Sequence, residues 1–261
     1  MENINSQIQL SKQKLKSLPI RKIIPNIVTM LAVCAGITSI KYSIAGSYSK
    51  AIICVFLAAF FDMLDGRVAR MLKGSTKFGA ELDSLSDFVS FGVAPAILMY
   101  QWTLSGFARF GWFFCLLYAI CMAMRLARFN TMLEDEPLPT YWNNFFTGVP
   151  APAAAALAVL PIMLSFEFKD WEFLHSHWLC SSVMFIVAML MISRIPTIST
   201  KHMKVPTYMV APLFVLVVFG AALVFNKPWM VLSAITILYA VTIPVGVYFF
   251  LKGKKIHNTR I

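Results

Sequence analysis

The sequence predicts an all-α integral membrane protein with about eight transmembrane helices. Hydrophobic residues make up 59% of the chain and charged residues 13%, with a mean hydropathy of +0.71. This composition is typical of polytopic membrane proteins. Apolar runs also recur along the chain, each close to the ~20 residues that a helix needs to cross a bilayer. The runs fall near residues 23–43, 50–72, 85–105, 110–130, 147–166, 178–194, 207–225 and 229–251.

The runs divide the chain into three parts. Residues 1–20 are polar and basic, and two interpretations stay open for them, a cytoplasmic tail or a short interfacial helix. Residues 21–204 are expected to form a six-helix transmembrane core that contains every motif discussed below. Residues 205–261 are expected to add two transmembrane helices and a basic cytoplasmic C-terminus.

The distribution of Lys and Arg predicts the orientation. All but five of the 23 basic residues fall at the helix ends that share a side with the N-terminus. The five exceptions are Lys41, Lys50, Arg109, Lys169 and Lys227. Because cytoplasmic loops are enriched in Lys and Arg, both termini are expected in the cytoplasm and the protein in the cytoplasmic membrane. The net charge of +11 reflects this bias, and nucleic acid is not an expected partner because the basic residues adjoin no base-reading module.

Four aspartates, Asp62, Asp65, Asp83 and Asp87, lie within sequence that otherwise predicts membrane helix. A carboxylate at bilayer depth costs at least about 2.5 kcal/mol, so four together require compensating charge. Members of each pair are three or four residues apart, and on a helix such a pair shares one face. The polar turn at residues 73–79 predicts that the two helices run antiparallel, which would bring the four carboxylates together.

Carboxylates without accompanying His or Cys favour Mg²⁺ or Mn²⁺ over zinc. Two such ions about 3.5–4 Å apart would suit phosphoryl transfer. The small residues Gly66 and Ala69 would let a flat ligand approach the backbone, and Arg70 is a natural phosphate partner. Gly79 is expected to let the chain turn before the second acidic helix. Two other interpretations stay open, an ion-coupling site of a transporter and helix caps exposed to water.

These residues resemble a known family. Asp62, Asp65, Gly66, Ala69, Arg70, Gly79, Asp83 and Asp87 match all eight fixed positions of the CDP-alcohol phosphatidyltransferase signature, over 26 residues. The segment Pro25 to Thr29 is similar to the P-N-x-x-T of that family. Residues 83–96, 125–130, 147–152 and 193–197 resemble its phosphatidylserine synthase branch. Phe88 stands where branches with phosphorylated acceptors usually have Lys. The resemblance covers about residues 25–204.

The resemblance implies a reaction between CDP-diacylglycerol and L-serine that gives phosphatidylserine and CMP. It implies two divalent cations, Mg²⁺ or Mn²⁺, one held by Asp62, Asp65 and Asp83 and the other by Asp62, Asp83 and Asp87. Asp87 would be the catalytic base, and the acyl chains would stay among the membrane lipids. The expected contacts to CDP-diacylglycerol are Asn26, Thr29, Gly66, Ala69, Arg70 and Thr76. Family members commonly form homodimers, so a homodimer is expected.

The choice of acceptor is a separate hypothesis. The serine carboxylate requires a cation, and Arg125 and Arg128 are the basic residues we expect to provide it. Alternatively, both arginines could be anchors at the end of a membrane helix, and Asn26 and Thr29 could cap the first helix. A sister enzyme that uses glycerol 3-phosphate or an inositol phosphate is the first rival function, and a cation-coupled transporter is the second.

Overall fold

The computed structural model describes residues 20–72, 74, 76–132, 145–193, 196–198, 220, 223 and 226–258. The predicted N-terminal tail and most of the predicted helix at 207–225 lie outside this part of the chain. Eight α-helices are described: α2 (Ile20–Ile44), α3 (Tyr48–Met71), α4 (Lys77–Asp87), α5 (Ala94–Trp102), α6 (Ala108–Met132), α7 (Ala151–Glu167), α8 (His177–Ile192) and α10 (Pro228–Asn258). A π-helical segment, η1 (Phe88–Val93), joins α4 to α5, and two short 3₁₀ turns, η2 (Leu104–Gly106) and η4 (Glu172–His175), follow α5 and precede α8.

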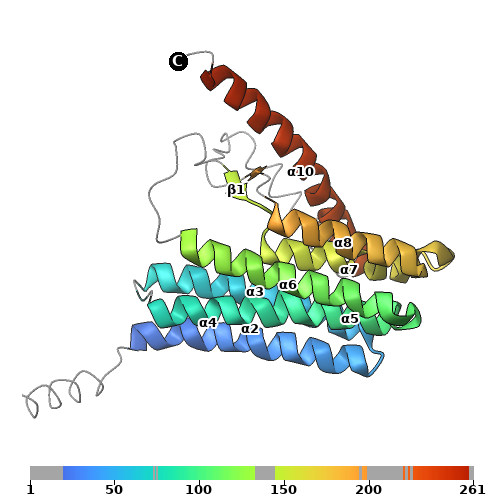
Figure 1. Ribbon diagram of the computed structural model, residues 1–261. Helices are drawn as coiled ribbons and strands as arrows, with labels where there is room; N and C mark the ends of the chain where they lie inside the picture. The colour runs from blue at the N-terminus through green and yellow to red at the C-terminus, as the bar shows by residue number, and fades with distance from the viewer. Residues whose placement is uncertain are drawn as a thin grey trace, which may run out of the picture.

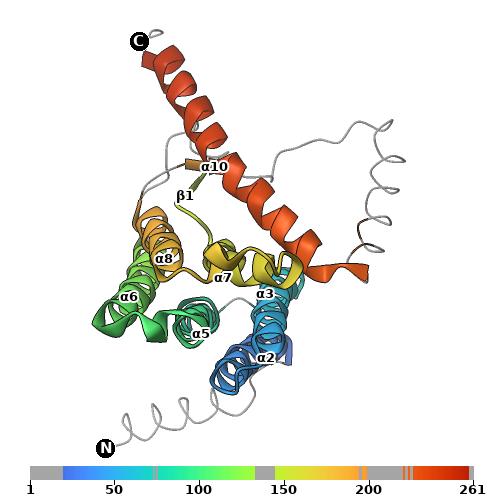
Figure 2. The ribbon, with the colours of Figure 1, turned by 90° about the vertical axis from the view of Figure 1, so that its right-hand side faces the viewer.

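Helices α2 to α8 lie side by side along one axis, as Figure 1 shows, and are seen nearly end-on in Figure 2. Helix α2 packs against α3, α4 and α5, and α6 packs against α8. Helix α10 crosses α7 and leaves the bundle at an angle, so that its C-terminal half points away from the other helices (Figure 2). The buried core contains mainly alanine, methionine and other apolar side chains, and Tyr118 is its largest fully buried member.

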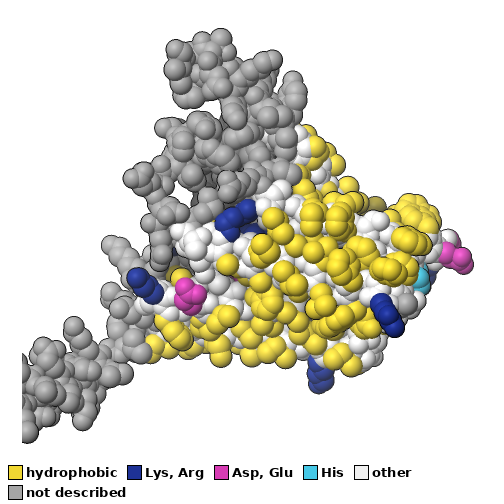
Figure 3. Space-filling model, in the orientation of Figure 1, with side chains coloured by type: hydrophobic (Ala, Val, Ile, Leu, Met, Phe, Trp, Pro, Cys, Tyr) yellow, Lys and Arg dark blue, Asp and Glu magenta, His cyan; other side chains and the backbone are white. Residues whose placement is uncertain are grey.

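Four described segments are long and apolar enough to cross a membrane: Ile23–Ile44, Lys77–Trp102, Arg109–Thr131 and Pro228–Gly246. Helices α7 and α8 are apolar but shorter. Many large apolar side chains are exposed on the outside of the bundle, and Figure 3 shows them covering most of one face. In water such a surface would be unstable, so the fold is that of a membrane protein. The third helical stretch begins at Lys77 and not near residue 85, because the polar residues between these positions form helix α4.

The π-helical segment η1 is fixed from two sides. On one side the hydroxyl of the buried Tyr118 donates to the carbonyl of Phe91 over 2.8 Å. On the other side the hydroxyl of Ser90 donates to the carbonyl of Ala32 over 3.1 Å. Gly36 makes this second contact possible, because a Cβ there would lie 2.5 Å from the Ser90 oxygen. These two bonds therefore hold η1, which directly follows Asp87, against both α2 and α6.

The sequence interpretation did not include strands, and the structure adds one short pair. Strand β1 (Phe145–Thr147) pairs antiparallel with β2 (Pro196–Ile198), with Phe146 opposite Thr197. Strand β2 also packs against α10. Three-residue strands bury too little surface to produce an alternating pattern in the sequence, which explains why they were missed.

Candidate active site

The two acidic helices are joined by a tight connection. Helix α3 ends at Met71, and α4 begins at Lys77 after the N-cap Thr76, whose side chain accepts a hydrogen bond from the Gly79 backbone N–H over 2.9 Å. The expectation that Gly79 makes the turn is wrong, because Gly79 lies inside α4. A Cβ at Gly79 would lie 3.0 Å from the Asn26 Oδ1 and 3.1 Å from the Thr76 Oγ1. The glycine therefore allows α2 and α4 to approach closely beside the site.

The aspartates of both helices meet at the end of this hairpin. One carboxylate oxygen each from Asp62, Asp83 and Asp87 lies within 4.8 Å of the other two. Asp65 is 5% exposed and interacts electrostatically with Asp62 and Asp83. We call these four residues the aspartate cluster.

The aspartate cluster has the properties of a divalent cation site. Asp65 Oδ2 and Asp87 Oδ1 are buried and have no hydrogen-bond partner. Buried polar atoms are nearly always paired, and carboxylates this close repel one another, so the cluster requires positive charge. The ligands are hard carboxylate oxygens with no His or Cys among them, a set that suits Mg²⁺ or Mn²⁺.

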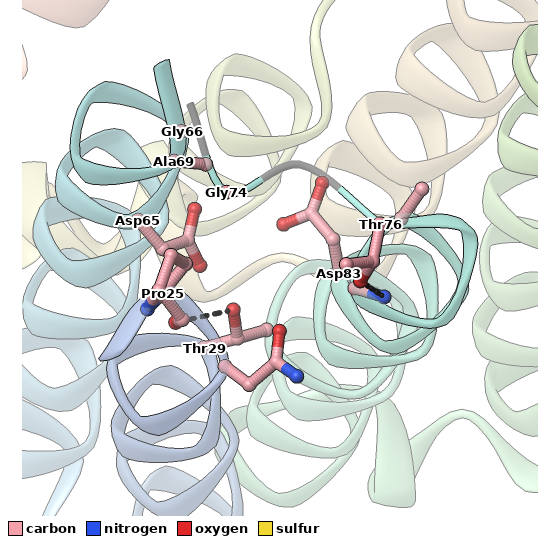
Figure 4. A pocket seen from close by; sticks show the side chains of 11 residues that line it. Pro25, Thr29, Asp65, Gly66, Ala69, Gly74, Thr76 and Asp83 are labelled. Carbon is pink, nitrogen blue, oxygen red and sulfur yellow. Dashed lines mark hydrogen bonds between the residues drawn. The ribbon is translucent and has the colours of Figure 1, made fainter. Parts of the chain in front are cut away.

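A pocket adjoins the cluster (Figure 4). Its lining residues are Pro25, Asn26, Thr29, Asp65, Gly66, Ala69, Gly74, Thr76, Gly79, Ala80 and Asp83. Asp65 and Asp83 stand on opposite walls with their carboxylates turned toward the space between them (Figure 4). A Cβ at Gly66 would meet no atom within 4 Å, so this wall leaves room for a ligand.

Five of the six residues predicted to contact CDP-diacylglycerol line this pocket. Arg70 is the exception, since it is exposed at the end of α3 and is not part of the lining. The alternative in which Asn26 and Thr29 cap the first helix is wrong, because α2 begins at Ile20 and both residues lie inside it. The Thr29 hydroxyl donates to the Pro25 carbonyl over 3.1 Å.

The two arginines predicted to bind serine have different surroundings. The Arg128 guanidinium donates to the carbonyl of Ile192 over 2.7 Å and makes longer contacts of 3.5 Å with Met191 and 3.4 Å with Ser193. These carbonyls end helix α8, so Arg128 acts there as a C-terminal cap. Arg125 instead interacts electrostatically with Asp87, and its Nε is buried without a hydrogen-bond partner. Arg125 therefore makes no hydrogen bond through its Nε, whereas the Arg128 guanidinium is bonded to the end of α8.

The sequence interpretation missed two positioning residues. Tyr118 fixes η1 directly after Asp87, and Asn130 donates to the Ser84 hydroxyl over 3.0 Å, which ties α6 to α4 between Asp83 and Asp87. The spacing of Tyr118 could have indicated its role, because it precedes Arg125 by seven residues and so shares its helix face.

The chain is similar to proteins of a known family. The family model described as CDP-alcohol phosphatidyltransferase matches residues 22–193, and a second, CDP-alcohol phosphatidyltransferase 2, matches residues 208–244. A CDP-diacylglycerol–serine O-phosphatidyltransferase from Mycobacterium leprae is 38% identical over 227 residues, covering 87% of this chain and 75% of the relative. A protein of the same name from Helicobacter pylori is 36% identical, and the match covers 83% of this chain and 87% of the relative. An archaetidylserine synthase from Methanothermobacter thermautotrophicus is 37% identical, and the match covers 66% of this chain and 68% of the relative.

Proposed function

The chain belongs to the CDP-alcohol phosphatidyltransferase family, and from this premise we propose that it transfers the phosphatidyl group of CDP-diacylglycerol to the hydroxyl of L-serine, with release of CMP. The names of the relatives support serine as the acceptor. The relatives from M. leprae, H. pylori and M. thermautotrophicus all have serine in their names, although the lipid part of the name differs for the last.

The pocket beside the aspartate cluster is the proposed binding site of the cytidine diphosphate group. Asn26, Thr29 and Thr76 provide polar side chains to it, and Gly66 and Ala69 leave space next to the backbone of α3. Arg70 lies outside the lining, so we assign it to the phosphates only at the mouth of the pocket. The acyl chains would remain in the bilayer.

We assign two divalent cations, Mg²⁺ or Mn²⁺, to the aspartate cluster. Asp62, Asp65 and Asp83 would hold one ion, and Asp62, Asp83 and Asp87 the other, in agreement with the triad of oxygens within 4.8 Å. When bound, these ions would neutralise the pyrophosphate and the charge that develops on the leaving CMP.

Asp87 is the proposed general base. The serine hydroxyl attacks the β-phosphorus, its proton passes to the Asp87 carboxylate, and the bond from that phosphorus to the CMP oxygen breaks. Asp87 Oδ1 is buried, and it is available for this step because it accepts no hydrogen bond. A carboxylate is a weak base for an alcohol, so proton transfer must accompany formation of the new P–O bond.

Arg125 is the proposed partner of the serine carboxylate. It lies beside Asp87, and its guanidinium has the planar fork that binds carboxylates in a bidentate manner. We assign Arg128 a positioning role at the end of α8, since its fork already contacts three carbonyls.

For the membrane arrangement we propose eight transmembrane helices, both termini in the cytoplasm and a homodimer in the cytoplasmic membrane. The described α-helices form seven stretches, because α4, η1 and α5 are continuous. Together with the apolar run at 207–225, these stretches make eight. The concentration of Lys and Arg at one side supports the orientation, in which the aspartate cluster opens toward the cytoplasm.

The observation that supports this function most directly is the convergence of Asp62, Asp83 and Asp87 beside a pocket lined by the predicted nucleotide contacts. The test is CMP release from CDP-diacylglycerol by the detergent-purified protein, with Mg²⁺ or Mn²⁺. The acceptors are L-serine, glycerol 3-phosphate and an inositol phosphate. We expect release that depends on serine and is abolished by EDTA.

Asp87→Asn is expected to abolish release, and Glu81→Gln is the matched control because Glu81 is an exposed carboxylate on the same helix, outside the aspartate cluster. Release with another acceptor would contradict serine as the substrate. No release with any acceptor, together with cation-driven uptake into sealed vesicles, would instead support a transporter.

A further inference from the structure

Three helices, one of which carries part of the aspartate cluster, each have a buried polar atom without a partner. The atoms are Asp87 Oδ1 on α4, Arg125 Nε on α6 and the hydroxyl of Tyr239 on α10, and none of them has a hydrogen-bond partner. Arg125 interacts electrostatically with both Asp87 and Tyr239. Arg125 and Tyr239 do not line the nucleotide pocket, so the polar groups around Arg125 are distinct from it. Buried polar groups are nearly always paired, so unpaired groups that interact with a cationic Arg125 favour a ligand at this place.

Tyr239 is held in place by the packing of α10. This helix packs against α7 and β2, and its buried face carries Ser233, Thr236 and Ile243. Tyr239 is partly buried and packs against the same hydrophobic core. Its position is therefore fixed by the fold, although it lies outside the 22–193 segment that contains the aspartate cluster.

The other hydroxyls on α10 contrast with Tyr239. Thr236 donates to the Leu232 carbonyl and Thr242 to the Tyr239 carbonyl, so both are satisfied within their own helix. A tyrosine hydroxyl stands too far from its own backbone for such a bond, and requires a partner from elsewhere. The nearby charged group identified for it is the Arg125 guanidinium, which is also a donor and cannot accept from it.

We propose that Tyr239 is a specificity-determining residue of the acceptor site, whose hydroxyl donates to the carboxylate of the bound amino acid while Arg125 pairs with the same carboxylate. Neither Arg125 nor Tyr239 donates a hydrogen bond to Asp87, so two donors, one of them cationic, stay available for an anionic ligand. The ammonium group of the amino acid would be repelled by Arg125, which leaves the carboxylate as the group that faces Tyr239. This assignment rests on the proposed function.

The test is steady-state kinetics of Tyr239→Phe, which removes the hydroxyl and keeps the ring. We expect the KM for L-serine to rise roughly tenfold to hundredfold, the range for a lost hydrogen bond to a charged group. The KM for CDP-diacylglycerol is expected to stay within about twofold, because Tyr239 lies outside the nucleotide pocket. Ser233→Ala is the matched control, since Ser233 also has a buried, unpartnered hydroxyl on α10 but lies six residues before Tyr239, on a different side of the helix. Its KM values are expected to match those of the unaltered protein.

Three results would overturn the proposal. The first is an unchanged KM for serine in Tyr239→Phe. The second is a rise in the KM for CDP-diacylglycerol instead, which would place the hydroxyl at the nucleotide. The third is an equal rise for serine in Ser233→Ala, which would mean that α10 acts only through packing. Failure of the proposed function is recognised separately, because the unaltered protein would then release no CMP with serine.

Discussion

Replacing Arg128 separates a structural role from a ligand-binding role. The guanidinium makes one short bond to Ile192 and two long contacts at the end of α8. A hydrogen bond involving a charged group contributes about 1.5–3 kcal/mol, and the two long contacts add little. We therefore expect Arg128→Ala to lower the free energy of unfolding by about 2–3 kcal/mol. With about 2–4 °C per kcal/mol for a chain of this size, the apparent Tm should fall by about 4–12 °C.

The assay combines thermal unfolding in detergent with the KM for serine. Arg128→Ala should lower the Tm and leave the serine KM within about twofold, and Arg128→Lys should recover part of the loss because it keeps the charge but not the fork. Arg109→Ala is the control, since Arg109 is an exposed arginine at the opposite end of α6. A tenfold rise in the serine KM without a fall in Tm would refute the capping role and return Arg128 to the acceptor site.

Three further outcomes are expected. Tyr118→Phe removes the hydrogen bond to the Phe91 carbonyl, which should cost about 0.5–1.5 kcal/mol by thermal unfolding. It should also lower kcat for CMP release more than either KM, and an unchanged kcat would mean that η1 does not position Asp87. Thr76→Val removes the N-cap of α4, which should cost about 1 kcal/mol by thermal unfolding and be partly recovered in Thr76→Ser. Gly66→Leu should fill the open space at the pocket wall and raise the KM for CDP-diacylglycerol more than tenfold, whereas an unchanged value would place the nucleotide elsewhere.

Much of the site could be predicted from the sequence because its residues are close together in the chain. Asp62 and Asp65 share one helix, Asp83 and Asp87 share the next, and a short connection brings the two helices together. Helical spacing is then sufficient to place the carboxylates near one another.

The remainder depends on contacts between distant segments. The roles of Arg125 and Arg128 could not be separated by spacing, since both lie on α6 and the difference arises from the carbonyls of α8, more than 60 residues later. The purpose of Gly79 was misread for the same reason, because the atom that limits space at this glycine belongs to Asn26 on α2. The pairing of β1 with β2 likewise joins segments that no local pattern connects.

The charges of the site indicate that binding of the metal and binding of serine affect each other. Without ions, Arg125 faces the carboxylate of Asp87, and this attraction opposes the use of its guanidinium for an anionic ligand. Cations at the aspartate cluster would neutralise Asp87 and leave Arg125 free to attract a carboxylate. Binding of the metal and binding of serine should therefore strengthen each other, and by thermodynamic linkage the coupling should be the same in both directions. Removal of the divalent cation would then weaken the binding of serine as well as stop the transfer.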